Sequence, residues 1–470
     1  MGFNNRVREL SLLREWWESP TPRPALIWGR RRVGKTALIT EFAARAGART
    51  IYHIGGTRSA TAELAALSQR AAAVTVAGRR NPAERPFQTW DDALEHLARQ
   101  AATEPLLLVL DEFPELVHSS PELPGVLRAF LDHPDGVAQL RILLCGSAVR
   151  AMGAMQEHRA PLYGRFDLSM QLHPFRPHEA AEFLPDLGPS DRAFAYGILG
   201  GTPLYLGWWR QDLSIAENVL QLACRPGARL LSEGELVLST EVDPGEYPAA
   251  VLEAIATGKT RHHEIADVIG TDPSRSLRQL LQLRLVEQVL PVTESQRRTR
   301  RKIYRIADPF LRFYLGPLQR YRTEIERGLG PDIVGPLLDS LAEHLGSVYE
   351  EAFRDHLRRL AVDGELGPRV VAVGPWWREG GQDEIDAVVL SEPERTRVPV
   401  LVGEAKWTRR VDGRRIQARL AAKALNLTDT PDELTYAICA REEVISHDPK
   451  IRAITAADIF QLPADKPATQ

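Results

Sequence analysis

Cysteine is scarce in this chain, and long apolar runs and a strong net charge are absent. The three cysteines, Cys145, Cys224 and Cys439, are far apart and form no C-x-x-C or Cys/His pattern. This excludes a disulfide framework and a zinc site of that kind. No segment approaches the roughly 18 apolar residues that a membrane span needs. These absences predict a soluble cytoplasmic protein with reduced cysteines and no membrane partner.

The charge balance limits the kinds of partner that the protein could bind, and the length limits the number of its domains. The formal net charge is only −3, so no global basic field indicates nucleic acid, and any such surface must be local. With 470 residues the chain is too long for one ordinary core, because domains usually have about 100–200 residues. We expect three or so domains.

A complete G-x-x-x-x-G-K-T loop follows the short apolar run 25–28 and precedes a helical pattern at 37–46. In such a strand–loop–helix unit, glycines admit backbone N–H groups to phosphates, Lys35 neutralises the β/γ oxygens, and the Thr36 hydroxyl ligates Mg²⁺. A glycine turn with a surface lysine is the alternative. We predict that the chain binds ATP or GTP, with Mg²⁺. The predicted nucleotide-binding residues are Gly29, Arg30, Arg31, Arg32, Val33, Gly34, Lys35, Thr36, Ala37 and Asp111.

Strand-like and helix-like runs alternate after this loop, which is typical of a parallel sheet with helices on both faces. One very apolar run, 106–110, ends in Asp111 and Glu112. Because ligands bind at the C-terminal ends of parallel strands, both carboxylates should lie at the nucleotide. We expect Asp111 to hold the Mg²⁺ water shell and Glu112 to act as the general base. A solvated acidic turn is the alternative.

Two more residues are candidates for the same chemistry. Ser147 follows the buried run 140–145 and could sense the γ-phosphate, although a plain strand-end serine is equally consistent. Arg165 precedes the next strand and could supply charge to the transferring phosphoryl group, in its own chain or in a neighbouring copy of a homo-oligomer. A structural salt bridge is the alternative for Arg165.

The middle of the chain has two different patterns. Residues 173–240 are mixed and helical, as in a lid after a nucleotide-binding sheet. Residues 241–330 contain three short helical patterns and two strand-like runs that are joined by a very basic segment, an order that predicts a winged helix-turn-helix. Its third helix and hairpin tip would contact DNA, unless the module only docks protein or another domain. The DNA-contacting candidates are Arg275, Arg278, Arg297, Arg298, Arg300 and Arg301.

Residues 331–470 carry a second group of chemical side chains. The runs 384–390 and 399–407 are strand-like, and a hairpin between them places Asp386 opposite Glu404, with Lys406 on the same face. Two carboxylates at this separation suit Mg²⁺ or Mn²⁺, and the lysine suits phosphodiester hydrolysis. A stabilising Glu/Lys alternation on an exposed hairpin is the alternative.

Three further features bear on this C-terminal group. Glu350, in a helical pattern from about 337 to 360, could add a third oxygen ligand. Val400 and Val402 are expected on the same face as Glu404, which would make the charges emerge from a buried stripe. Several basic residues between Arg409 and Lys423 would give the domain a positive rim suited to a phosphate backbone.

Motifs over nearly the whole length resemble an archaeal and bacterial ATPase family that joins a P-loop ATPase of the AAA+/STAND kind to a C-terminal DUF234 region. The resembling segments are Phe3 to Leu10, Trp28 to Thr36, Val109 to Phe113, Leu162 to Arg165, Gly200 to Pro203, Ile306 to Phe313 and Gly403 to Trp407. The resemblance implies an α/β ATPase core, a winged helix and a restriction-endonuclease-like domain of the PD-(D/E)xK type. Asp386, Glu404 and Lys406 match that nuclease motif, with Ile385 in place of the usual proline.

We therefore expect four parts: an ATPase core at 1–172, a helical lid at 173–240, a winged helix at 241–330 and a nuclease-like domain at 331–470. The leading hypothesis is an ATPase that acts on DNA and drives a winged helix and a Mg²⁺-dependent nuclease domain. The alternative is a regulatory ATPase whose C-terminal domain only binds nucleic acid or a protein partner. A chaperone-like ATPase without a DNA role would leave the arginine clusters unexplained.

Overall fold

The computed structural model describes residues 3, 5–20, 23–74, 80–102, 104–133, 139–241, 247–295, 299, 301–378 and 383–462. The chain folds into two compact units, Met1–His173 and Pro174–Gln470. Within the described residues, no helix is both long and apolar enough to span a membrane.

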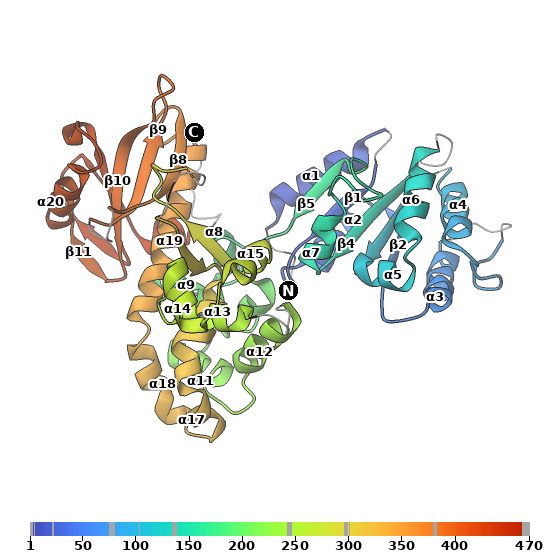
Figure 1. Ribbon diagram of the computed structural model, residues 1–470, viewed down its shortest axis with the longest axis horizontal. Coiled ribbons are helices and arrows are strands. Elements are labelled where there is room, and N and C mark those ends of the chain that lie inside the picture. Colours follow the sequence, from blue (N-terminus) through green and yellow to red (C-terminus); the bar gives the residue numbers. More distant parts are fainter. Residues whose placement is uncertain are drawn as a thin grey trace. The chain divides into compact units, whose positions relative to one another are not determined.

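The first unit is built on a five-stranded sheet in the order β2-β3-β4-β1-β5, and all of its pairings are parallel (Figure 1). Its strands are β1 (Ala25–Trp28), β2 (Arg49–Ile54), β3 (Leu106–Asp111), β4 (Leu140–Gly146) and β5 (Leu168–Gln171). Its helices are α1 (Val7–Glu18), α2 (Lys35–Arg45), α3 (Ala60–Ala72), α4 (Trp90–Ala101), α5 (Phe113–Ser119), α6 (Leu123–Asp132) and α7 (Val149–Ala154).

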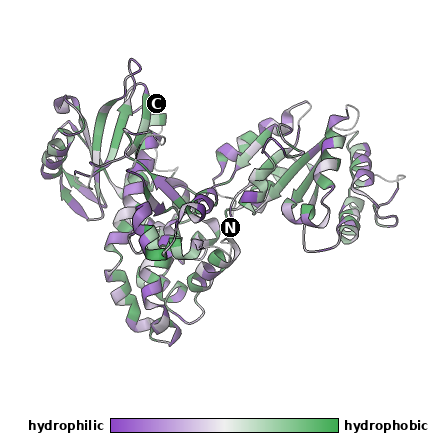
Figure 2. Cartoon of the chain, in the orientation of Figure 1, coloured by the Kyte–Doolittle hydropathy of each residue, from purple (hydrophilic) through white to green (hydrophobic). Residues whose placement is uncertain are grey.

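Helices cover both faces of this sheet because its central strands are apolar on both faces. Along β3, Leu106, Leu108 and Leu110 pack in one hydrophobic cluster, while Leu107 and Val109 pack in another. This alternation follows from the two-residue period of a strand. The strands are accordingly strongly hydrophobic in colour (Figure 2). The predicted parallel α/β core with a P-loop is confirmed.

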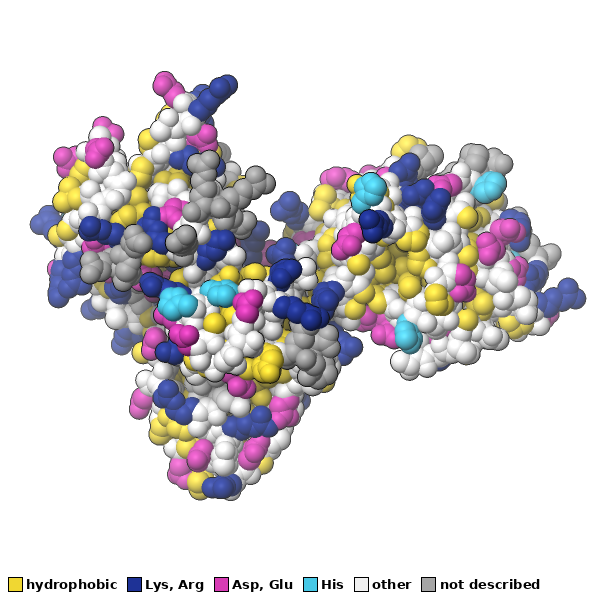
Figure 3. Space-filling model, in the orientation of Figure 1, with side chains coloured by type: hydrophobic (Ala, Val, Ile, Leu, Met, Phe, Trp, Pro, Cys, Tyr) yellow, Lys and Arg dark blue, Asp and Glu magenta, His cyan; other side chains and the backbone are white. Residues whose placement is uncertain are grey.

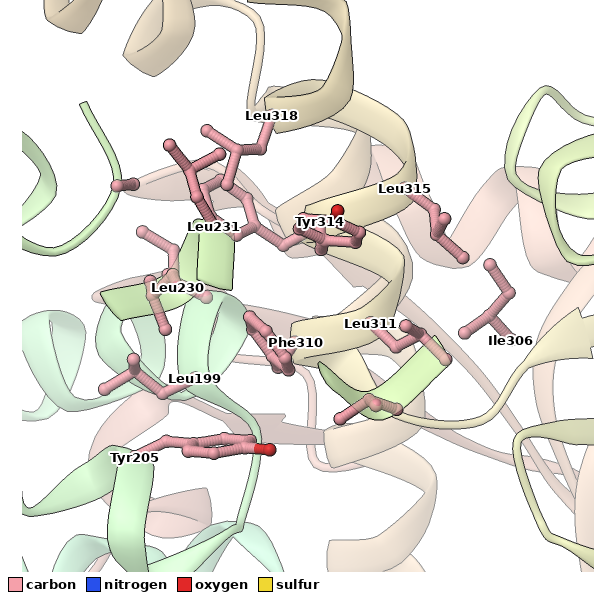
Figure 4. Packing of buried hydrophobic residues seen from close by; sticks show 14 of the residues in the cluster. Leu199, Tyr205, Leu230, Leu231, Ile306, Phe310, Leu311, Tyr314, Leu315 and Leu318 are labelled. Carbon is pink, nitrogen blue, oxygen red and sulfur yellow. The ribbon is translucent and has the colours of Figure 1, made fainter. Parts of the chain in front are cut away.

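In the second unit, the predicted lid and winged helix share one hydrophobic core. The cluster runs from Phe175 to Leu345, and a part of it brings Leu199, Tyr205 and Leu230 together with Phe310 and Tyr314 (Figure 4). The helices are α8 (Pro177–Ala181), α9 (Pro189–Leu199), α10 (Pro203–Leu206), α11 (Ile215–Leu222), α12 (Arg229–Glu241), α13 (Pro248–Ala256), α14 (His262–Ile269), α15 (Ser274–Gln282), α16 (Pro309–Phe313), α17 (Arg322–Glu326) and α18 (Gly330–Asp339).

The predicted order of three helices and a hairpin is present within this shared core. Helices α13 to α15 precede the antiparallel pair β6 (Val286–Val289) and β7 (Ile303–Ile306). A π-helical turn, η1 (Tyr314–Leu318), and a 3-10 turn, η2 (Gln319–Tyr321), lead from α16 to α17.

The remainder of the second unit is a five-stranded sheet in the order β14-β12-β10-β9-β8. Helix α19 packs against one face and α20 against the other, and β11 pairs with β13 beside the sheet. The predicted helix at 337–360 is divided, because α18 ends at Asp339 and α19 begins at Ala342. The elements are α19 (Ala342–Val362), β8 (Val370–Trp376), β9 (Ile385–Ser391), β10 (Val398–Lys406), β11 (Arg410–Asp412), α20 (Gly413–Ala424), η3 (Pro431–Glu433), β12 (Thr435–Ala440), β13 (Glu443–Ile445), β14 (Ile451–Ile454) and α21 (Ala456–Ile459).

Candidate functional site

The phosphate loop lies between β1 and α2, at the C-terminal edge of the parallel sheet. Gly34 is the N-cap of α2 with φ of 92°, a left-handed conformation that glycine adopts without strain. A Cβ on Gly29 would lie 2.3 Å from the carbonyl oxygen of Leu172, so only glycine fits there. The loop therefore brings bare backbone to the start of a helix, where N–H groups and the helix dipole favour phosphate.

Lys35 folds its side chain back over this loop. Its Nζ donates hydrogen bonds to the carbonyl oxygens of Gly29, at 2.8 Å, and Arg30, at 3.0 Å, and the residue is only 7% exposed. The ammonium is thereby held inside the loop, where a positive charge can neutralise nucleotide phosphates. Arg31 is exposed, and Arg32 has a φ of 70°.

Asp111, at the end of β3, is held by groups from three directions. Its Oδ2 accepts a hydrogen bond from the hydroxyl of Tyr52 at 2.6 Å and lies 3.3 Å from Oγ1 of Thr36. Its Oδ1 accepts from the backbone N–H of Glu112 at 2.9 Å. A threonine hydroxyl beside a carboxylate is an oxygen donor pair that fits Mg²⁺ with its retained waters. The structure thus brings Thr36 and Asp111 together as the sequence predicts.

Tyr52 is a site residue that the sequence analysis misses. It lies opposite Val109 in the β2–β3 pairing, so it shares a face with Asp111 two residues further along, and a long side chain can reach this diagonal neighbour. Burial, followed by the hydrogen bond to Asp111, raises the pKa of Tyr52, so the phenol stays a donor. The strand register supplied this neighbour, and only pairing β2 beside β3 would have revealed it.

Glu112 and Ser147 lie at the ends of the adjacent strands β3 and β4. The backbone N–H of Ser147 donates to Glu112 Oε2 at 3.1 Å, and its hydroxyl contacts both carboxylate oxygens at 2.9 Å. Glu112 has a φ of 49°, a left-handed conformation that costs a non-glycine residue energy and often marks functional positions. The carboxylate is thus oriented by Ser147, whose role as a γ-phosphate sensor stays a prediction.

Arg165 lies away from the nucleotide site of its own unit. It precedes β5, which places it at the N-terminal edge of a parallel sheet whose phosphate loop is at the C-terminal edge. Its Nε and Nη2 donate to the two carboxylate oxygens of Asp132, at 3.1 and 2.9 Å. Within its own unit, the parallel strands separate Arg165 from the phosphate loop, which favours the salt-bridge alternative; its role in a neighbouring copy stays a prediction.

Arg6 is a second functional candidate near the loop. It is 4% exposed, and its Nη2 donates to the carbonyl oxygens of Val33, at 3.0 Å, and His173, at 2.6 Å. Its Nη1 pairs with Glu9 at 2.9 Å. Arg6 therefore ties the start of the chain to the phosphate loop and to the last residue of the first unit. The signal in the sequence was the Phe3 to Leu10 motif, to which the analysis assigned no role.

In the second unit, β9 and β10 pair in the predicted antiparallel register, with Gly403 opposite Ala387. The backbone N–H of Ala405 donates to Oδ2 of Asp386 at 2.9 Å. Lys406 Nζ pairs with Oε1 of Glu404 at 2.8 Å. The expectation that Val400 shares a face with Val402 is wrong: Val402 packs with α20 and Val400 with the α19 cluster, because a register shift lies between Pro399 and Leu401.

Electrostatic coupling brings Glu350 into this group, which we call the carboxylate cluster: Glu350, Asp386, Glu404 and Lys406. Burial and then the charge of Asp386 raise the pKa of Glu350 to about 7. Burial also raises the pKa of Asp386. Although burial opposes it, the hydrogen bond and charge of Glu404 raise the pKa of Lys406. The four side chains therefore lie close enough to interact electrostatically.

The carboxylate cluster does not form a ready three-carboxylate metal site. Among the described residues, no group of three or more His, Cys, Asp or Glu side chains could hold a metal ion. Glu404 is 5% exposed, and its Oε2 is buried without a hydrogen-bond partner, while Lys423 Nζ lies 3.6 Å away. The donors are the oxygens that Mg²⁺ prefers, but Lys406 and Lys423 neutralise Glu404 in this arrangement, so the site is not preformed for a metal ion.

The hairpin that follows α15 docks within the second unit. The backbone N–H of Val292 donates to the carbonyl oxygen of Pro375 at 2.8 Å. Arg301 pairs with Glu294, and its Nη1 donates to the carbonyl oxygen of Trp377 at 2.9 Å. The guanidinium of Arg301 thus fastens the hairpin to the segment after β8, and its contact with DNA stays a prediction.

The other predicted DNA contacts divide into two groups. Arg275 and Arg278 lie on the exposed face of α15, three residues apart and on one side of the helix. Their opposite face is buried through Leu277 and Leu280. Arg297, Arg298 and Arg300 lie outside the described residues.

Comparison with known families and proteins matches most of the chain. Residues 3–207 match a family of ATPase domains predominantly from Archaea, and residues 314–416 match a family of archaeal and bacterial proteins of unknown function. The uncharacterized protein MJECL04 of Methanocaldococcus jannaschii is 25% identical over 409 residues, which are 86% of this chain and 87% of that protein.

Solved structures also resemble this chain. The Walker-type ATPase PABY2304 of Pyrococcus abyssi has a TM-score of 0.51 at 20% identity, over 67% of this chain and 96% of its own. The ORC2 protein of Aeropyrum pernix, in its ADPNP-ADP complexes, has a TM-score of 0.43 at 18% identity, over 72% of this chain and 96% of its own. The likeness to PABY2304 shows a shared architecture.

Proposed function

We propose that this P-loop ATPase uses ATP to act on DNA. Its residues 3–207 match the family of ATPase domains found predominantly in Archaea, and residues 314–416 match a family of unknown function. The observation that carries the ATPase part is the convergence of Lys35, Thr36, Asp111 and Glu112 at one edge of the parallel sheet. This is the set that phosphoryl transfer to water requires.

Each residue at this edge has a role that its position supports. The loop from Gly29 to Ala37 cradles the phosphates, with Lys35 as the balancing charge. Thr36 and Asp111 would hold Mg²⁺, which lends positive charge to the phosphates when bound. Glu112, fixed by Ser147, accepts the proton of the attacking water.

The proposal includes a second activity, DNA cleavage. In it, Asp386, Glu404 and Lys406 form the cleavage site of a PD-(D/E)xK-like domain. The buried Oε2 of Glu404 favours this assignment: it accepts no hydrogen bond and has only an ion pair with Lys423 at 3.6 Å, so a hydrogen-bonding or metal ligand could still complete it. The lysine pairs on Glu404 and the docked Arg301 favour the alternative, a domain that only binds nucleic acid or a protein partner.

Two measurements on the purified full chain test both parts. We expect Lys35→Ala to abolish ATP turnover. Cleavage of linear, supercoiled, single-stranded and branched DNA, with Mg²⁺ or Mn²⁺ and with or without ATP, should disappear in Asp386→Ala and Lys406→Ala while ATP turnover remains. Asp429→Ala, which removes an exposed carboxylate of the same domain, is the matched control. Cleavage that survives Asp386→Ala would remove the carboxylate cluster from the proposal, and no cleavage by any protein would favour the binding domain.

A further inference from the structure

The basic residues around α20 fall into two groups that differ in their pairing. Arg409 and Arg410 are exposed but neutralised, because Arg409 pairs with Glu442 at 2.9 Å and Arg410 with Glu443 at 2.8 Å. Arg415 and Arg419 are also exposed, and neither has an acidic partner within 4.0 Å among the described residues. The uncompensated positive charge of this region therefore lies on α20.

The two unpaired arginines form a line along the helix with Lys423. Arg415, Arg419 and Lys423 are spaced four residues apart, so they share one side of α20, and successive charges are separated by about 6 Å along the axis. The adjoining side of α20 packs on the sheet through Ile416 and Leu420. We call these three cations the α20 stripe. Figure 3 shows Lys and Arg side chains gathered over α20 and β11 at the left margin of the view.

The α20 stripe ends at the carboxylate cluster. Lys423 Nζ donates to the carbonyl oxygen of Glu384 at 2.7 Å and lies 3.6 Å from Oε2 of Glu404. That oxygen is the buried carboxylate atom without a hydrogen-bond partner. A chain of phosphates bound along the stripe would thus be led from the solvent-exposed arginines to Lys423, which contacts the cluster through Glu404.

We propose that the α20 stripe binds the phosphate backbone of one DNA strand and leads it to the carboxylate cluster. A row of cations at regular spacing on a rigid helix suits a polyanion with regularly repeated charges, and it supplies affinity without reading bases. The chain has a net charge of −3, so this attraction depends on local charge rather than on the whole molecule. The inference rests on the proposed action on DNA but does not require that the cluster cleaves.

The test compares two double variants that remove the same number of charges from the same domain. Arg415→Gln/Arg419→Gln removes the unpaired arginines, and Arg409→Gln/Arg410→Gln removes the paired ones. Both are made in full-length protein that carries Asp386→Ala, so that cleavage cannot consume the probe. Fluorescence anisotropy of a labelled single-stranded oligonucleotide and of a duplex of the same length is measured over a range of salt concentrations.

We expect the stripe variant to lose about 1.4 from the slope of log affinity against log salt for the single strand, since each lost phosphate contact contributes about 0.7. The paired variant should keep the slope of the parent. Arg415→Lys/Arg419→Lys should restore it, because the charge returns while the arginine geometry does not. Melting curves confirm that all variants fold.

Three outcomes separate the inference from the proposed function. Equal losses in the stripe and paired variants would overturn the α20 stripe, since only overall charge would then matter. Binding that follows the expected pattern without cleavage by wild-type protein would leave the stripe standing and remove the nuclease activity. Absence of DNA binding by the parent, with an acidic protein retained by Arg415 and Arg419 instead, would overturn the stripe as a DNA surface.

Discussion

Removing one hydroxyl group, with Tyr52→Phe, should weaken the coupling between Mg²⁺ and ATP at the phosphate loop. The hydroxyl donates to Oδ2 of Asp111 at 2.6 Å, on the oxygen that faces Thr36. A hydrogen bond to a charged group contributes about 1.5–3 kcal/mol. Phenylalanine keeps the ring in its place, so the loss falls mainly on the orientation of Asp111.

A factor of ten in an equilibrium constant is about 1.4 kcal/mol. The lower end of that range, about 1.5 kcal/mol, therefore corresponds to a roughly tenfold higher Mg²⁺ concentration at half-maximal ATP turnover. Binding of a fluorescent ATP analogue without Mg²⁺ should not change, whereas the gain in affinity on adding Mg²⁺ should shrink by a similar factor. Tyr163→Phe, an exposed tyrosine of the same unit, is the control.

The reasoning fails if Tyr52→Phe lowers the melting temperature but leaves the Mg²⁺ dependence of binding and turnover unchanged. Tyr52 would then be a packing residue of β2. If Tyr163→Phe also raised the Mg²⁺ concentration needed for half-maximal turnover, the effect of Tyr52→Phe could not be assigned to Asp111, because Tyr163 lies outside the site.

Three other predictions concern catalysis and stability. Lys35→Ala should weaken ATP binding, measured by titration, and abolish turnover, measured by phosphate release. Glu112→Gln should keep ATP binding and lower turnover by about 10²–10⁴-fold, because Glu112 is the proposed general base. Unchanged turnover in Glu112→Gln would assign the role of general base to another residue. Burial lowers the pKa of His344 to about 4, and its ring bonds the carbonyl oxygen of Gly197 at 2.7 Å. Since the unfolded chain then binds a proton that the folded chain does not, stability should fall by up to about 1.4 kcal/mol per unit as pH drops from about 6.5 to about 4. Denaturant midpoints should show a shallower fall in His344→Gln, and an identical slope would contradict the assignment.

The shared core of the second unit limits how far its predicted lid and winged helix could move apart. Phe310 and Tyr314 pack with residues of the predicted lid, and Leu285 and Ile306 bring the hairpin into the same cluster. The segments predicted as lid and winged helix therefore cannot separate without exposing this core to water, which is costly. The hairpin is also fastened by Arg301. These contacts indicate that the two predicted segments form one rigid body.

Sequence patterns predicted the local parts of this protein well. The phosphate loop, the apolar strand that ends in Asp111 and Glu112, and the antiparallel pairing of β9 with β10 all depend on short-range rules: glycine conformation, the two-residue period of strands, and turn position. The strand that precedes Ser147 was predicted in the same way. Such rules act within a few residues, so one sequence suffices to apply them.

Tertiary structure decided which residues meet across distant segments. The register of β2 against β3 placed Tyr52 on Asp111, and the parallel sheet put Arg165 at the edge opposite the phosphate loop. Pairing with Glu442 and Glu443 determined which arginines around α20 keep an uncompensated charge. These outcomes depend on packing between segments that lie tens to more than a hundred residues apart. A local pattern of residue types does not predict such neighbours, because they come into contact only when the hydrophobic cores pack.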